Sequence, residues 1–170
     1  LHRAVDVAHD TFAAHWIRRH RDIDIVMPHQ GSALRTLHAA RDIGAHSVLV
    51  VHHPLSHNRI VAAEYKKLGG SAPPPLSPRY RREIEAADYL LTPSALTTDS
   101  LPEVGVPETK IKEIPWGINP TGRNEHATRK AVDQVRFLFV GKLSIHKGLH
   151  ILRDAWSSMT RRDVSLTLVG

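Results

Sequence analysis

The stretch that decides the fold is Val135–Gly148, VRFLFVGKLSIHKG, in which an apolar run leads into a turn that contains glycine. Residues 135–140 are almost all apolar, which is typical of a strand buried on both faces of a parallel sheet. Apolar residues then recur at helical spacing over 149–159, and a second short apolar run follows at 165–170. The order strand, turn, helix, strand predicts a right-handed βαβ unit.

The turn of this unit carries residues suited to binding an anion. In an open α/β sheet such a turn lies outside the carboxyl end of the strand, where ligands bind. The helix start near Gly148 presents free N–H groups and a positive dipole end, and Lys142 and Lys147 add two full charges. Gly141 lets an anion approach the backbone without a Cβ in the way. The residues therefore favour a phosphate or diphosphate ligand, although two solvated lysines at an ordinary turn would give the same pattern.

The composition describes a globular protein. A length of 170 residues fits one domain or parts of two, and 41% hydrophobic with 24% charged residues excludes a disordered chain. There are no cysteines, which excludes disulfides and thiolate metal sites. No apolar run is long enough to span a bilayer and no signal peptide opens the sequence, so we expect a cytoplasmic location.

The formal charge is +6, from 23 Lys and Arg against 17 Asp and Glu. Nucleic acid binding is one interpretation of a basic chain. However, the basic residues are scattered in short groups, and aromatic residues make up only 5%, which is poor for stacking on bases. Affinity for anionic substrates or lipid headgroups fits the charge as well, so a peripheral contact with a membrane stays open.

The first part of the chain also alternates helices and strands. We expect helices over 5–20, 32–42, 59–68 and 79–87, and strands over 23–27, 47–51, 88–92 and 110–115. Ser32 is the expected N-cap of the second helix. These elements predict another α/β block, and the polar, aperiodic stretch 121–134 predicts a linker between the two.

Histidines cluster after the strand at 47–51, in the loop His52-His53-Pro54-Leu55-Ser56-His57. Such a cluster suggests a metal at first sight. However, Pro54 prevents the helix that would align His53 and His57 on one face, and no nearby carboxylate completes a ligand set. We therefore expect no metal here. A histidine that hydrogen-bonds substrate hydroxyls or transfers a proton is the favoured interpretation.

The order of these signals resembles the glycosyltransferases of family 4. The matching segments are 85–94 (EAADYLLTPS), Gly105-Val106-Pro107 with Lys110-Ile111, 114–119 (IPWGIN), 137–143 (FLFVGKL) and Lys147-Gly148. The resemblance implies an α/β fold of GT-B type, with two Rossmann-like domains facing across a cleft and both incomplete here. Residues 1–117 would then belong to the acceptor-side domain, 118–134 to the linker and 135–170 to the first βαβ of the donor domain.

This family moves a sugar from a nucleotide-diphospho-sugar to an acceptor with retention of anomeric configuration, usually without a metal. The resemblance implies that Gly141, Lys142 and Lys147 bind the donor diphosphate. It implies no cofactor beyond the nucleotide sugar. The expected partners are that donor and a carbohydrate or lipid-linked acceptor, with no nucleic acid. On the acceptor side it implies a catalytic histidine, His57. It also implies a set of cleft residues, which are His29, Gln30, Gly31, Ser32, His53 and Ser94.

The sequence departs from the family in ways that bear on activity. Asn119 stands where the linker motif usually has Asp, and the glycine-rich loop near the family's amino terminus is absent. The paired glutamates of the family would lie beyond Gly170, so we expect this chain alone to transfer no sugar. Two other interpretations stay open. One is a nucleotide-sugar epimerase or a phosphorylase of similar architecture, and the other is a basic, non-catalytic module that binds nucleic acid or an anionic membrane.

Overall fold

The computed structural model describes residues 2–71, 77–117 and 134–170 of the chain. These residues fall into two compact units, one within 1–60 and 74–117 and the other within 61–73 and 118–170. The linker expected at 118–134 lies, apart from Gln134, outside the described residues, as does Asn119. The domain boundaries expected from the sequence therefore stay a prediction.

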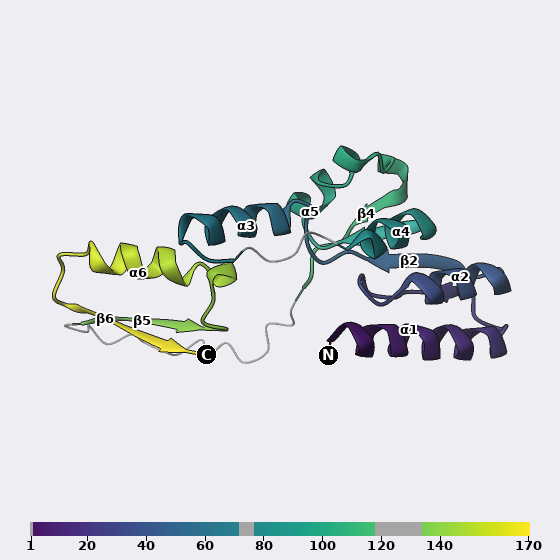
Figure 1. Ribbon diagram of the computed structural model, residues 1–170, viewed down its shortest axis with the longest axis horizontal. Helices are drawn as coiled ribbons and strands as arrows, with labels where there is room; N and C mark the ends of the chain where they lie inside the picture. Colours follow the sequence, from purple (N-terminus) through teal and green to yellow (C-terminus); the bar gives the residue numbers. More distant parts are fainter. Residues whose placement is uncertain (1, 72–76, 118–133) are drawn as a thin grey trace, which may run out of the picture. The chain divides into compact units, whose positions relative to one another are not determined.

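The first unit is built on a parallel sheet with the strand order β1-β2-β3-β4 (Figure 1). Its strands are β1 (Ile25–Val26), β2 (His46–Val50), β3 (Tyr89–Thr92) and β4 (Ile111–Glu113). Each strand pairs in parallel with the next. Because all four strands run in the same direction, the loops that follow them emerge at one edge of the sheet. The α/β class predicted from the sequence is confirmed.

Helices connect these strands. They are α1 (His2–Arg19), α2 (Leu34–Ile43), α4 (Pro78–Ala86) and α5 (Ala95–Asp99), with short 3-10 turns η1 (Pro102–Val104) and η2 (Glu108–Lys110). The helix α3 (His57–Lys67) begins in this unit, and its residues from Val61 on belong to the second unit. In Figure 1, α1 and α2 lie side by side. Two apolar clusters hold the unit together. Leu37, Leu49, Leu90 and Leu101 centre one of them, and Ala14, Ile17, Ala39 and Ala40 form the other, between α1 and α2.

The N-cap predicted at Ser32 is wrong. The helix α2 begins at Leu34 after Ala33, and no local side chain caps it. Instead, the fully buried carboxylate of Asp10 in α1 accepts the N–H groups of Arg35 (2.9 Å) and Thr36 (2.8 Å). A carboxylate places a full negative charge at the positive end of the helix, which stabilises the end more than a hydroxyl does. The cap is therefore supplied by a residue distant in sequence.

The second unit contains the βαβ segment predicted from Val135–Gly148. Its elements are β5 (Val135–Val140), η3 (Ile145–Lys147), α6 (Leu149–Ser157) and β6 (Val164–Val169), and β5 pairs with β6 in parallel along its whole length. The burial predicted for β5 is wrong for the described residues, since Leu138 is 66% and Val140 is 70% exposed. Two strands and one short helix supply too little surface to cover both faces of the sheet.

Candidate functional site

Four histidine rings lie in a row at the edge of the first unit where β1 and β2 end. The Nδ1 atom of His29 is 2.8 Å from Nε2 of His52, and the two rings stack with centroids 4.6 Å apart. His52 lies 6.2 Å from His53, which in turn stacks on His57 at 4.9 Å. We call His29, His52, His53 and His57 the histidine row. Sequence reasoning selected the loops that contain all four residues, but it did not predict the contact between His29 and His52.

Pro54 has the local effect predicted for it, but His53 and His57 nevertheless come together. The helix α3 begins only at His57, so no helix includes both residues. The N–H of His57 donates to the carbonyl oxygen of Pro54 at 2.9 Å, and this turn lays the two rings face to face. The expectation that no helix would align His53 and His57 is therefore confirmed, and a turn brings the two rings together instead.

The hydrogen bond between His29 and His52 restricts how the pair binds protons. One of the two facing nitrogens must donate and the other must accept, so the bond is lost when both rings are charged. Burial lowers the pKa of His52 from its ordinary value of 6.5, and the charges of His29 and His53 lower it further. His52 is therefore neutral near pH 7, and its other ring nitrogen can donate to or accept from a hydroxyl group, depending on the tautomer.

Trp116 extends this site beyond the residues singled out from the sequence. Its indole ring meets His52 edge-on with centroids 5.6 Å apart, and the residue is 67% exposed. It follows β4 at the same edge of the sheet, inside the segment 114–119 that carried the resemblance. An exposed ring beside hydrogen-bonding imidazoles combines an apolar face with polar groups, as binding sites for small polar molecules do.

The turn 29–32 is held in place by Glu83 of α4. The two carboxylate oxygens of Glu83 accept the N–H groups of Gly31 (2.6 Å) and Ala33 (2.9 Å). Glu83 is fully buried, and Arg79 Nε donates to it at 3.0 Å while also forming an ion pair with Asp10. One buried ionic network therefore fixes both the site turn and the start of α2. Sequence reasoning missed it because its members lie far apart in the chain.

Gly31 is needed at its position for two reasons. Its φ of +106° lies where side chains are strongly disfavoured, and a Cβ there would lie 3.1 Å from Cε1 of Tyr80. The neighbouring Gln30 donates its N–H to the carbonyl oxygen of Val50 at 3.0 Å, which ties the turn to β2. The backbone of this turn is therefore fixed by both strand and helix.

Two acceptor-side residues remain to be placed, Ser32 and Ser94. Ser32 lines a cavity of about 700 Å³ together with His29, and the rest of its wall is mostly apolar and comes from α1 and β1. Ser94 precedes α5, where its carbonyl oxygen accepts the N–H groups of Thr97 and Thr98. Among the described residues Ser94 has no hydrogen bond or ring contact with the histidine row. Ser94 follows β3 and therefore lies at the same edge of the sheet as the histidine row.

The predicted anion site lies in the second unit, in the turn between β5 and α6. Gly141 has φ +150° and donates its N–H to Val169 at 2.9 Å, which closes the ends of the two strands together. The side chains of Lys142 and Lys147 are both exposed, and neither ammonium group forms a hydrogen bond or ion pair with a described residue. Gly148 precedes α6 with φ +72°, and no side chain caps that helix. The diphosphate-binding role of these residues stays a prediction.

The second unit also includes the end of α3. Glu64 Oε2 lies 3.2 Å from Nε2 of His150, and the ring of Tyr65 meets that of His146 edge-on at 6.2 Å. Hydrogen bonds from Lys67 and then from His150 lower the pKa of Glu64 below its ordinary value. A carboxylate therefore stands beside the first turn of α6. No local sequence signal indicates this pair, because its members are 86 positions apart.

Neither a metal centre nor a membrane span is found in the part of the chain that the structure describes. Within residues 2–71, 77–117 and 134–170, no three His, Asp or Glu side chains are grouped to hold a metal ion. Within the same ranges, no helix combines the length and apolar content that crossing a bilayer requires.

A parallel α/β sheet with a polar site at its carboxyl edge is shared by many classes of protein, so the class must come from comparison with known families. A profile described as Glycosyltransferase Family 4 matches residues 2–121, which is more than half of the chain. The chain belongs to glycosyltransferase family 4. The match contains the whole histidine row but ends before Val135, so the turn with Lys142 and Lys147 lies outside it. Comparisons with curated proteins and with solved structures gave no match.

Proposed function

We propose that the protein transfers a sugar from a nucleotide-diphospho-sugar to a hydroxyl group of a carbohydrate or lipid-linked acceptor, with retention of anomeric configuration. Membership of the family supports glycosyl transfer, and with it a sugar donor and an acceptor. The observation that carries the choice of donor is the pair of exposed lysines in the turn after β5, Lys142 and Lys147, whose ammonium groups pair with none of the described residues. The proposal needs no metal and no cofactor besides the donor.

The donor role follows from where charge develops during transfer. The bond between the anomeric carbon and the diphosphate oxygen breaks, and the nucleoside diphosphate leaves with the electron pair. Two ammonium groups and the uncapped amino end of α6 are suited to stabilise that negative charge. The bare backbone at Gly141 leaves room for a phosphate to approach.

The acceptor role is assigned to the histidine row and the turn 29–32. An acceptor hydroxyl loses its proton as its oxygen bonds to the anomeric carbon. A neutral imidazole can accept that proton or hold the hydroxyl by a hydrogen bond. We assign this role to His57, which His53 supports by stacking. Trp116 beside His52 supplies a flat apolar surface for a sugar ring.

Calorimetric titration of the chain with UDP, GDP, ADP, uridine and pyrophosphate tests the donor half of this proposal. We expect saturable binding of at least one nucleoside diphosphate and of pyrophosphate, and no binding of uridine alone. Binding of the nucleoside with none from pyrophosphate would argue against a diphosphate site. Retention is read from the anomeric proton coupling of the product that the native protein forms, where an inverted product would contradict it.

A further inference from the structure

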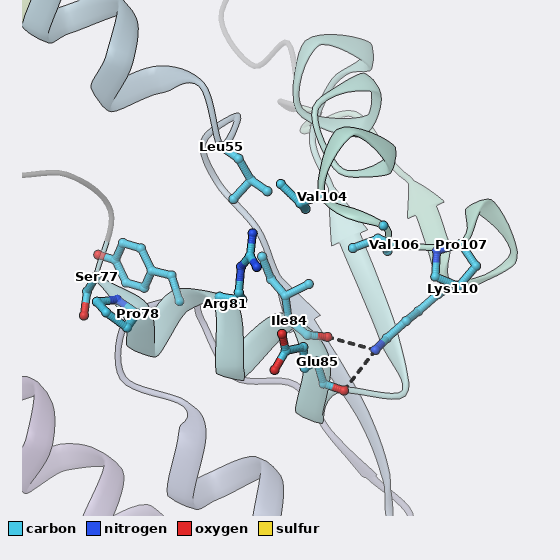
Figure 2. Close-up of a pocket in the computed structure, with 12 residues that line it drawn as sticks. Leu55, Ser77, Pro78, Arg81, Ile84, Glu85, Val104, Val106, Pro107 and Lys110 are labelled. Atoms are coloured by element: carbon cyan, nitrogen blue, oxygen red, sulfur yellow. Dashed lines mark hydrogen bonds between the residues drawn. The ribbon is translucent and has the colours of Figure 1, made fainter.

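A cavity of about 720 Å³ opens in the first unit between α4 and the segment that runs from η1 to Lys110 (Figure 2). A volume of this size is typical of sites for small organic molecules. No member of the histidine row lines it. Its wall comes from Leu55, from α4 with Ser77 before it, and from the segment between Val104 and Lys110.

Much of this wall is apolar. Figure 2 shows the side chains of Leu55, Val104 and Val106 gathered around the space beside Ile84. Ile84 is buried in the main apolar cluster, against which Leu55 and Val106 also pack, so this surface is anchored in the core. Apolar surface lining a concave site favours a ligand with an apolar body.

Two cationic side chains, Arg81 and Lys110, also line the cavity, and each has N–H donors that no described residue accepts. In Figure 2 the guanidinium of Arg81 extends toward Leu55 and Val104, and it forms no hydrogen bond or ion pair with a described residue. The Nζ atom of Lys110 donates to the carbonyl oxygens of Ile84 (2.8 Å) and Glu85 (3.3 Å). An ammonium group has three N–H donors, so one remains. With the carboxylate of Glu85 counted, the charged groups of the lining sum to one positive charge.

We propose that this cavity binds a small organic anion with an apolar body and one carboxylate or phosphate group. The apolar body packs against Leu55, Val104 and Val106, and the anionic group pairs with Arg81. Guanidinium is the side chain that pairs best with carboxylate and phosphate, because it offers parallel N–H donors. Lys110 adds the second positive charge of the wall. The site is separate from the sugar-transfer proposal and does not rest on it.

Binding of four probes to the chain tests this proposal. Thermal unfolding and calorimetry monitor the binding, with each amphiphilic probe kept below its critical micelle concentration. The probes are decanoate, decyl phosphate, decyltrimethylammonium and inorganic phosphate. We expect a saturable rise in Tm with decanoate or decyl phosphate, and the comparison of these two distinguishes a carboxylate from a phosphate ligand. Inorganic phosphate lacks the apolar body and decyltrimethylammonium has the wrong charge, so neither should bind.

Two substitutions locate the binding. Arg81→Gln should weaken binding of the anionic probe by about tenfold or more, whereas Arg82→Gln, at the next exposed residue and outside the cavity wall, should leave it unchanged. Val106→Trp should fill the cavity and abolish binding, and if that variant does not fold, the arginine pair still decides. Absence of saturable binding, equal binding of decyltrimethylammonium, or equal effects of the two arginine substitutions would overturn the proposal.

Discussion

The Nδ1 atom of His29 and the Nε2 atom of His52 lie 2.8 Å apart, and their hydrogen bond joins the loops that follow two neighbouring strands. The bond exists only while at least one ring is neutral. Burial and the charges of its neighbours keep the pKa of His52 below 6.5, so the fold itself favours the neutral ring. The geometry of the histidine row is therefore linked to pH.

The free energy of unfolding should decrease as the pH is lowered, because of His52. The unfolded chain binds a proton at this residue near its ordinary pKa of 6.5, whereas the folded protein binds it only at lower pH. The free energy of unfolding therefore decreases as pH drops through 6.5, and this loss stops growing below the folded pKa. Urea unfolding between about pH 7.5 and pH 5 should show a smaller decrease for His52→Asn than for the wild type. The exposed His38→Asn should behave like the wild type, and identical slopes for all three proteins would refute the assignment.

Removing the buried charge of Glu83 should destabilise the first unit strongly. Glu83→Gln removes the charge that balances Arg79. It also replaces one of the two carboxylate oxygens that accept the N–H groups of Gly31 and Ala33 with an NH2 group, which cannot accept. We expect a loss of about 3 kcal/mol in the free energy of unfolding. Glu85→Gln on the same helix should change it by less than about 0.5 kcal/mol, because this side chain is exposed. Similar losses in the two variants would mean that the buried network contributes little.

Asp10 should prove to be the cap of α2. Asp10→Ala leaves the N–H groups of Arg35 and Thr36 without their acceptor, at an expected loss of about 2 kcal/mol. Hydrogen exchange gives a more local measurement, since these two amides should lose protection before the rest of α2 does. The matched control is Asp6→Ala, an exposed position one turn earlier in α1. Unchanged protection of both amides in Asp10→Ala would show that the cap lies elsewhere.

A side chain should be tolerated less well at Gly31 than at Gly44. Both residues have positive φ, but a Cβ at Gly44 meets nothing within 4 Å, whereas at Gly31 it would press on Tyr80 at 3.1 Å. Gly44→Ala should lose about 1 kcal/mol from backbone strain alone, and Gly31→Ala should lose more. Chemical denaturation of the two variants measures the difference. An equal loss would show that the turn 29–32 shifts freely to make room.

The sequence alone predicts the order of the elements, because that order is local information. Apolar runs such as 135–140 and the helical spacing after Gly148 indicate strand and helix without knowledge of distant residues, and the structure confirms the α/β alternation. Local information fails where a distant group takes over a local role. Ser32 is a residue type favoured at an N-cap, but Asp10, 26 residues from Thr36, provides the acceptor in the structure.

The candidate site is predicted in part for the same reason. A loop after a parallel strand is expected at the carboxyl edge of the sheet, so the residues near 29–32 and 52–57 could be selected without a structure. Their pairing could not, since the contact of His29 with His52 and the contacts of Glu83 with Gly31 and Ala33 depend on tertiary packing. The sequence also did not predict that Leu138 and Val140 are exposed. An apolar run indicates that the residues are hydrophobic, but it does not indicate whether other elements pack over the strand.

Thermal unfolding with UDP, GDP and ADP most directly tests whether the turn after β5 binds the donor diphosphate. We predict that at least one nucleoside diphosphate raises Tm, that Lys142→Ala and Lys147→Ala each abolish the rise, and that Arg162→Ala, an exposed cation of the same unit, preserves it. No rise with any of the three, or a rise that survives both lysine substitutions, would contradict the account.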